Sequence, residues 1–412
     1  MRASVHDVAI VGGGLVGATL ACALGRAGLR VAVVEGRAAP AAAPGPEVFD
    51  LRVSTLTLSS IRILERVGAW EHMQHERVTP IREMFVWEHS GASIGFDAAD
   101  IGEPALGYIA ENTITTAALE RASADLQNVH WYRPATLEQM DVTAQGVSLR
   151  LDGGASNGTR VTARLVVGAD GARSRVRQLA ELGERFKSFE QSAVVATVRT
   201  SVAHRCCAWQ RFLPTGPLAF LPLPQDRCSI VWSTASDHAD ALLEMTPAAF
   251  GASLAEAFEH KLGEVTLEGE RAAFELSDMR AASYVAERVA LVGDAAHTVH
   301  PLAGQGVNLG LLDAASLAQV VQHHHARGRD FGLASNLRRY ERWRRGQNHQ
   351  AADVLSGFHH LFATRAAPVR LARGLGLGLV DRIAPLKRVI MRRASGLEGD
   401  LPDLARADLA SC

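Results

Sequence analysis

Apolar runs and helical periods alternate at the start of the chain. Residues 8–11 and 30–35 are short apolar runs of the kind found in fully buried parallel strands. Residues 15–27, between them, have the pattern of a helix that Gly28 ends. This order predicts a strand, a helix and a second strand, and therefore an α/β domain with a parallel sheet.

The same strand-to-helix pattern returns twice later in the chain. Residues 146–154 and 160–170 predict a hairpin whose second strand leads into a helix, and residues 287–294 form another buried strand. Residues 111–126 predict a helix, and the chain after Gly306 has helical patterning to its end. These segments extend the first domain.

The middle of the chain has a different pattern of apolar and polar residues. Residues 191–200 and 227–234 alternate like strands of an open antiparallel sheet, and a proline-rich apolar run, residues 211–224, separates them. Short strands are also expected at residues 82–88 and 92–97. No low-complexity linker divides these segments from the first domain, so we interpret the second lobe as an insertion.

We therefore predict a Rossmann-like domain with an antiparallel-sheet domain inserted in it and helices at the C-terminal end. The predicted boundaries are 1–80, 100–185 and 280–345 for the dinucleotide-binding domain, 81–99 and 186–279 for the sheet domain, and 346–412 for the C-terminal helical region.

Composition narrows the classes of protein. In 412 residues, 43 Lys and Arg balance 44 Asp and Glu, so no overall positive field favours a nucleic-acid partner. The five cysteines have no CxxC spacing, which is typical of reduced thiols in a cytoplasmic protein. The chain enters a strand too early for a signal peptide, and no apolar run reaches about 18 residues. We expect a cytoplasmic protein, soluble or peripheral at the inner membrane surface.

Three glycines stand between the first strand and the first helix. Gly12 permits a tight turn, Gly14 lets a pyrophosphate approach the backbone, and Gly17 lets the helix pack closely on the strand. The start of the helix adds partial positive charge. Glu35, at the end of the second strand, is placed to accept hydrogen bonds from ribose hydroxyls. The pattern predicts a dinucleotide, FAD or NAD, and disfavours a 2′-phosphate at this site.

Two aspartates follow other buried strands. Asp170, with Gly171, ends the strand of residues 160–170, and Asp294 ends that of residues 287–294. Ligands of open α/β sheets bind at the carboxyl ends of the strands. Both aspartates are therefore expected at the dinucleotide.

The motifs together resemble a known family. The glycine turn, "GADGARSR" from Gly168, and "GDAAHTVHPLAGQGVNLGLLD" from Gly293 are similar in order and separation to those of the para-hydroxybenzoate hydroxylase superfamily. "LGYIAEN", "FEQSAVVATV" and "QRFLPTGPLAFLPL" are most similar to the ubiquinone-biosynthesis hydroxylases of the UbiH/UbiF type. The resemblance spans about Asp7 to Gly396.

The resemblance implies FAD as the cofactor and assigns residues to it. Asp294 would bind a ribityl hydroxyl, and the backbone amides of a helix start would face the flavin's pyrimidine edge. Asp170 and Gly171 would lie near the pyrophosphate and near NADH or NADPH, docked transiently as the reductant. Asn112 stands where relatives often carry arginine or glutamine. The further cofactor residues implied are Arg52, Pro301, Gly304, Gly306, Val307 and Asn308.

The resemblance also implies the reaction, in which a flavin C4a-hydroperoxide hydroxylates a prenylated phenol or quinol ring with O₂. The apolar run of residues 211–224 would form a wall of the pocket, with ordinary sheet core as the alternative interpretation. The pocket candidates are Gln191, Arg211, Phe212, Phe220 and His297. No catalytic base is identified. His297 and His300 lack the carboxylate or cysteine spacing of a metal site, so no metal is expected.

Several alternatives stay open at this stage. The chain fits a flavin hydroxylase of another aromatic compound, or an FAD-dependent reductase of the same superfamily. Residues 361–393 carry eight basic residues against one acid, which fits contact with a membrane surface, a place in a ubiquinone-synthesis complex, or a helical cap on the FAD domain. The ring position, the choice of NADH or NADPH, and the oligomeric state are undetermined.

Overall fold

The first large sheet carries the glycine turn. The computed structural model describes residues 4–38, 45, 48–88, 91–154, 158–298, 306–363 and 383–407. In this sheet, β18, β11, β1, β2 and β8 run parallel, while β17, β10 and β9 are antiparallel to their neighbours. The strands are β1 (Ser4–Val11), β2 (Val31–Val34), β8 (Val129–Tyr132), β9 (Thr136–Val142), β10 (Val147–Asp152), β11 (Arg160–Gly168), β17 (Val285–Ala286) and β18 (Val289–Leu291).

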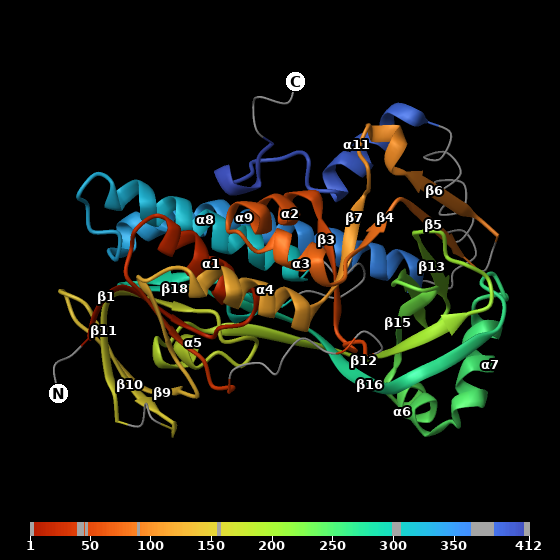
Figure 1. The fold of residues 1–412 in the computed structure, drawn as a ribbon, viewed down its shortest axis with the longest axis horizontal. Coiled ribbons are helices and arrows are strands. Elements are labelled where there is room, and N and C mark those ends of the chain that lie inside the picture. The colour runs from red at the N-terminus through yellow and green to blue at the C-terminus, as the bar shows by residue number, and fades with distance from the viewer. Residues whose placement is uncertain are drawn as a thin grey trace.

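Helices pack in a layer over this sheet (Figure 1). The central helix, α1, is buried from Gly17 to Gly25 because it contacts both α4 and α8. Small residues along α1 allow this close packing. The helices of this layer are α1 (Leu15–Arg26), α2 (Leu58–Arg66), α3 (Trp70–Glu76), α4 (Asn112–Ala124), α8 (Gly306–His325) and α9 (Ala334–Ala363). A further short helix, α5 (Arg175–Leu179), contacts β9 and β11.

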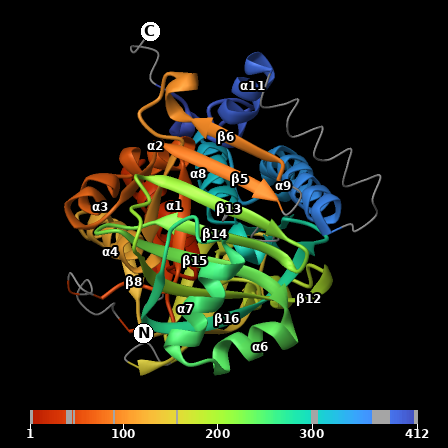
Figure 2. The same ribbon diagram turned by 90° about the vertical axis from the view of Figure 1, so that its right-hand side faces the viewer.

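A second large sheet stands beside the first in Figure 1, and in Figure 2 it faces the viewer. Its order is β19-β16-β12-β15-β14-β13-β5-β6, and all neighbours except β13 and β5 are antiparallel. Its strands are β5 (Glu83–Glu88), β6 (Ser93–Asp97), β12 (Glu184–Thr200), β13 (Cys207–Leu213), β14 (Gly216–Pro222), β15 (Arg227–Ala235), β16 (Val265–Ala281) and β19 (His297–Thr298). The predicted α/β fold with a second, antiparallel sheet is confirmed.

One face of the second sheet is covered by α6 (Ser236–Glu244) and α7 (Pro247–Ala257). Side chains alternate between the faces of a strand, so every second residue of β12, β14 and β15 faces these helices. The helix-facing residues share a core with Phe250 and Leu254 of α7. They include Val194, Ala196, Phe220, Ile230 and Trp232. Most of the side chains that fill this face are large.

The remaining elements connect the two sheets. A three-stranded sheet of β3 (Val53–Thr57), β7 (Gly107–Glu111) and β4 (Thr79–Ile81) lies between them. The other elements are α11 (Ala384–Ala394) and the single turns η1 (Ala98–Ile101), η3 (Gly293–Ala295) and η4 (Asp403–Ala405). Over the residues described, no helix is long and apolar enough to span a membrane.

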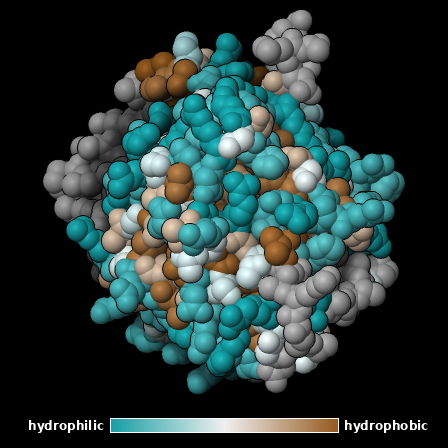
Figure 3. All heavy atoms as spheres, turned by 90° about the vertical axis from the view of Figure 1, so that its left-hand side faces the viewer, coloured by the Kyte–Doolittle hydropathy of each residue, from teal (hydrophilic) through white to brown (hydrophobic). Residues whose placement is uncertain are grey.

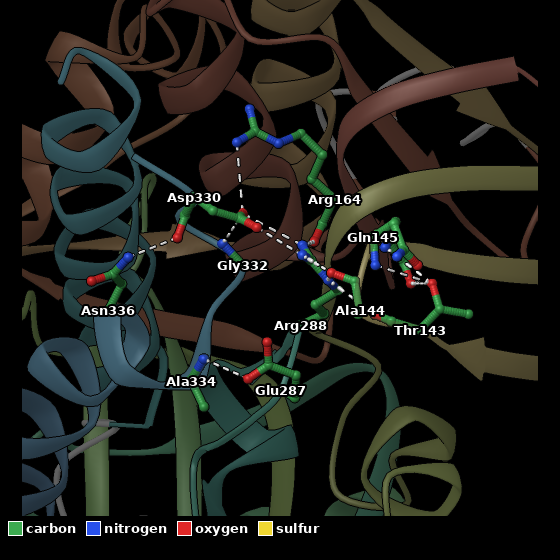
Figure 4. A network of polar contacts seen from close by, with 11 residues as sticks. Thr143, Ala144, Gln145, Arg164, Glu287, Arg288, Asp330, Gly332, Ala334 and Asn336 are labelled. Atoms are coloured by element: carbon green, nitrogen blue, oxygen red, sulfur yellow. Dashed lines mark hydrogen bonds and ion pairs between the residues drawn. The ribbon is translucent and has the colours of Figure 1, made fainter. Parts of the chain in front are cut away.

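Arg288 joins three separate segments of the first domain (Figure 4). Its guanidinium group is buried, donates to the carbonyls of Thr143, Ala144 and Arg164, and pairs with Asp330 at 2.7 Å. The β9–β10 turn, β11 and the segment before α9 are thereby held together. The face of the molecule opposite the second sheet is largely hydrophilic, with apolar residues in small patches (Figure 3).

Candidate functional site

Packing alone requires two of the three fingerprint glycines. A Cβ on Gly12, whose φ is +99°, would lie 2.3 Å from the carbonyl oxygen of Ala169, and one on Gly17 would lie 1.9 Å from that of Gly12. Gly14 differs, because a Cβ there would have no atom within 4 Å. Open space therefore lies beside the N-terminus of α1, where free amide N–H groups favour an anion.

Glu35 holds the glycine turn in place. Its carboxylate accepts hydrogen bonds from the backbone N–H of Gly13 at 2.7 Å and of Arg37 at 2.9 Å, and from the Arg37 side chain at 3.1 Å. Burial alone would raise the pKa of Glu35, but these hydrogen bonds together lower it. Glu35 is thus ionised and fixed next to the turn, and its bond to a ribose stays a prediction.

Asp170 lies where β11 ends, beside the same turn. Its Oδ2 accepts from the backbone N–H groups of Arg175 at 2.7 Å and Val176 at 3.2 Å, at the start of α5. Its Oδ1 is buried and has no hydrogen-bond partner among the residues described. Gly171 follows with φ +80°. One oxygen of Asp170 is therefore engaged by the protein, and the predicted contact of this residue with the dinucleotide stays a prediction.

A cavity of about 550 Å³ lies between the first domain and the second sheet. Of the predicted cofactor residues, Arg52, Asn112, Asp294, Gly306 and Val307 line it. Its other walls come from the second sheet, the β3 region and α11. They include Thr55, Thr57, Met84, Phe96, Ala193, Val195, Ala208, Gln210, Pro217, Ala219, Leu221, Ser229, Val231, Ser233, Phe274, Leu276, Thr298, Ile390, Met391 and Ala394.

Asp294 supplies the carboxylate of this cavity. Its side chain is exposed to the cavity, while protein surrounds it on the other sides, and this desolvation raises the pKa of Asp294 despite the nearby His297 and Arg52. A carboxylate at the edge of a cavity can accept a hydrogen bond from a hydroxyl group of a bound ligand. The start of α8 lies at the same cavity, and a Cβ on Gly306 would have no neighbour within 4 Å.

Asn308 locks the start of α8 against the β3–α2 corner. Its side-chain oxygen accepts from Thr57 N at 3.0 Å and Ser60 Oγ at 2.7 Å, and its amide nitrogen donates to Thr55 O at 2.7 Å. The side chain is buried, and both its oxygen and its nitrogen are hydrogen-bonded within the protein. Only the backbone of Asn308 is left for the predicted cofactor contact.

Arg52 and Asn112 meet at one end of the cavity. The backbone N–H of Asn112 donates to Arg52 O at 2.9 Å, and Ser54 Oγ donates to the Asn112 side chain at 2.7 Å. The Arg52 guanidinium lies 5.0 Å from the centre of the Phe274 ring. These contacts place one cation and one amide at the cavity. Pro301 and Gly304 lie outside the described residues.

The pocket candidates lie away from the lining of the cavity. Phe220 is fully buried on the helix-covered face, 4.1 Å from the Phe258 ring, and Arg211 pairs there with Glu259 at 2.6 Å. Because side chains alternate, their neighbours Ala219 and Gln210 face the cavity instead. Gln191, Phe212 and His297 are also outside the lining.

The sequence did not predict which polar residues of the second sheet line the cavity. Gln210, Ser229 and Ser233 line it among apolar neighbours, and the period-two pattern would identify them once the cavity face is known. In the described part of the chain, no cluster of three or more histidine, cysteine or acidic side chains is arranged to bind a metal.

Comparison with known proteins adds independent evidence. A family model described as an FAD binding domain matches residues 5–353. The chain is 40% identical over 392 residues to the ubiquinone hydroxylase UbiL of Rhodospirillum rubrum, covering 95% of this chain and 90% of that protein. It is 37% identical to the 3-demethoxyubiquinol 3-hydroxylase of Escherichia coli K12, covering 95% and 98%, respectively.

Solved structures share the fold. The p-nitrophenol 4-monooxygenase PnpA of Pseudomonas putida superposes with a TM-score of 0.80, at 19% identity over 97% of this chain and all of that one. PqsL of Pseudomonas aeruginosa, a probable FAD-dependent monooxygenase, superposes with a TM-score of 0.72, at 23% identity over 91% of this chain and all of that one.

The glycine turn gives a first prediction. In Gly14→Ala, the new methyl group fits the protein but occupies the space open to a pyrophosphate. We expect unchanged thermal stability of the apoprotein and FAD affinity weakened about tenfold or more, the cost of about 1.4 kcal/mol. Fluorescence titration of the apoprotein with FAD measures the affinity.

Gly17→Ala is the matched variant. Its methyl group would collide with the Gly12 carbonyl, so the apoprotein itself should melt at a lower temperature. Unchanged FAD affinity in Gly14→Ala would contradict a pyrophosphate at this turn.

Asp294 gives a second prediction. A raised carboxyl pKa means that ionisation destabilises the folded apoprotein, so Asp294→Asn should be more stable than the original at neutral pH. The difference should be absent below the unfolded pKa of about 4 and should grow as pH rises through it, until Asp294 ionises in the folded state. Melting temperatures from pH 3 to 8 measure it. A variant that is less stable than the original at neutral pH would disprove the expectation.

Proposed function

The chain belongs to the family of FAD-dependent hydroxylases that includes the ubiquinone-biosynthesis enzymes, and we propose that it hydroxylates the ring of a prenylated phenol or quinol intermediate of ubiquinone biosynthesis. The observation that supports this substrate is the continuous cavity wall that joins Asp294 and Gly306 to an apolar sheet face. A dinucleotide's reactive ring and an apolar aromatic substrate would thus share one enclosed space.

Residues of the first domain would hold the cofactor. Bound FAD accepts electrons from NADH or NADPH and activates dioxygen. The open space at Gly14 would take its pyrophosphate, and Asp294 would accept from a ribityl hydroxyl. The start of α8 would stabilise negative charge near its backbone amides at Gly306 and Val307. The reductant would dock transiently near Asp170 and Gly171.

Residues of the second sheet would hold the substrate. Val195, Leu221 and Val231 form an apolar floor that excludes water from the reacting ring. Gln210 and the two serines of β15 offer hydrogen bonds to ring oxygens within that floor. The chain would therefore orient the ring through few polar contacts, as expected for a ligand that is mostly hydrocarbon.

Quinone extracts test the proposed reaction. A strain lacking this protein should accumulate a prenylated ring compound short of one hydroxyl or methoxyl group, and mass spectrometry of the extract identifies it. The gene for the original protein should restore ubiquinone, and a gene for Asp294→Ala should not.

Two other outcomes would favour a different function. Unchanged ubiquinone in the deletion strain would disprove the proposed pathway and favour a hydroxylase of another aromatic compound. Substrate-dependent oxidation or reduction of the purified flavoprotein without ¹⁸O incorporation from ¹⁸O₂ would favour a reductase.

We further propose that α11 brings the cavity to an anionic membrane surface. Leu386, Val389 and Ile390 are 43%, 53% and 40% exposed and, with Arg393, share one face of the helix. Arg388 is exposed beside that face. Ile390 and Met391 also line the cavity, so the exposed apolar face is continuous with the proposed substrate site. A short basic helix with an apolar face is typical of an interfacial segment.

Sedimentation with lipid vesicles tests this contact. We expect the protein to bind vesicles rich in phosphatidylglycerol more tightly than vesicles of phosphatidylcholine. Arg388→Glu with Arg393→Glu should weaken that binding about tenfold or more, since each basic residue near the surface contributes about 1 kcal/mol. Leu386→Ser with Val389→Ser should also weaken it, through lost apolar burial.

Val142→Ser is the matched control. Val142 is 41% exposed and is the last residue of β9, a strand that lies far from α11 in Figure 1. Its substitution should leave vesicle binding unchanged. Equal binding by the original protein and both α11 variants would exclude this helix as the membrane contact.

A further inference from the structure

A buried carboxylate lies behind the cofactor side of the cavity. Asp313, on α8, is fully buried, and its two oxygens accept four hydrogen bonds. Oδ2 accepts from His297 Nε2 at 2.6 Å and from the backbone N–H of Gly293 at 3.1 Å. Oδ1 accepts from Arg344 Nε at 2.7 Å and Asn348 Nδ2 at 3.0 Å. The two oxygens thus serve two different parts of the chain.

The Oδ2 side holds the turn that carries Asp294. Gly293 directly precedes Asp294, and His297 follows it by three residues, so Asp313 fixes the η3 turn on both sides of that carboxylate. The Oδ1 side faces α9, where Arg344 and Asn348 are both buried. Asp313 therefore connects the η3 turn to the helix layer.

Close packing leaves little freedom around this connection. A Cβ on Gly310 would lie 2.6 Å from the Val16 side chain and 3.3 Å from the Gly293 Cα. The start of α1, the η3 turn and α8 are in direct contact at this point. A displaced η3 turn would therefore disturb both the glycine turn and the start of α8.

Charge favours a fixed geometry for Asp313. Burial alone would raise the pKa of its carboxyl, but His297 and Arg344 outweigh that effect and lower it to about 2. Asp313 is thus ionised at any ordinary pH, and its side chain is fully buried, away from bulk water. Its acceptor directions are set by the four donors around it.

We propose that Asp313 and His297 are positioning residues of the flavin site, which set the place of the Asp294 carboxylate relative to the start of α8. The inference rests on FAD binding and not on the quinone substrate. A purely structural role for Asp313 would make its Oδ2 and Oδ1 hydrogen bonds equally important for the cofactor. The proposed positioning role predicts that only the Oδ2 hydrogen bonds affect FAD binding.

Replacing two buried polar residues with leucine distinguishes an effect on the flavin site from an effect on the stability of the fold. His297→Leu removes a donor to Oδ2, and Asn348→Leu removes one to Oδ1. Because a hydrogen bond to a charged group contributes about 1.5–3 kcal/mol, each should lower the melting temperature of the apoprotein. Only His297→Leu should also raise the FAD dissociation constant, by about tenfold or more. It should also change the visible absorption spectrum of the bound flavin.

His297→Gln is the rescue variant, because its side-chain amide keeps a donor toward Asp313. It should restore the FAD dissociation constant to within about threefold of the original, which is well under 1 kcal/mol. Should His297→Leu fail to fold, His297→Asn gives the same comparison with a polar side chain too short to reach as far. The titration needs no aromatic substrate, so it is independent of the proposed pathway.

Two results would overturn the proposal. An unchanged FAD dissociation constant in the folded His297 variant would show that His297 does not position the flavin site. Equal increases in His297→Leu and Asn348→Leu, in step with their melting temperatures, would show that Asp313 only stabilises the fold.

Discussion

The cofactor side of the molecule depends on the buried carboxylate of Asp313. Burying an ion pair costs free energy that replacement by apolar residues would avoid. Here Arg344 balances the charge, and both carboxylate oxygens are fully hydrogen-bonded, so the interior contains no unpaired carboxylate at this point. The buried ion pair fixes the directions of the hydrogen bonds around Asp313. An apolar core would press α8 against the η3 turn, but it would not fix the turn's backbone N–H or the ring of His297.

Much of the first domain was predictable because its signals are local. The turn of Gly12, Gly14 and Gly17 lies between two adjacent elements, and the steric reason for two of the glycines is contact within that unit and with the neighbouring strand. The aspartates at strand ends were found by one geometric rule, since parallel strands bring their carboxyl ends to one edge. The rule located Asp294 at the cavity without any knowledge of its partners.

The sequence did not reveal contacts between distant segments. Asp313 is one polar position in a long helix, and its partners Arg344 and Asn348 stand 31 and 35 residues later on another helix. Glu35 was expected to face a ribose, and its carboxylate also accepts three hydrogen bonds from the protein itself, one from Gly13 of the glycine turn and two from Arg37. A carboxylate's residue type and spacing do not show which donors reach it, because that depends on packing between elements.

The second sheet shows why its cavity face was hard to identify. Both faces carry mostly apolar side chains, so the alternation of apolar and polar residues along a strand cannot distinguish the cavity face from the core face. Side-chain volume distinguishes the two faces at several positions: Ala193, Ala208 and Ala219 face the cavity, whereas Trp209, Phe220 and Trp232 take alternate positions on the same sheet.

An open cavity costs free energy in proportion to its volume, so the sheet face that lines it needs rigid support from the other face. The aromatic face provides that support. The rings of Trp87 and Phe258 lie 4.8 Å apart, and Phe220 packs on the same Phe258 ring. Those contacts keep the strands in register while their other side stays open. The cavity therefore depends on the large side chains that do not line it.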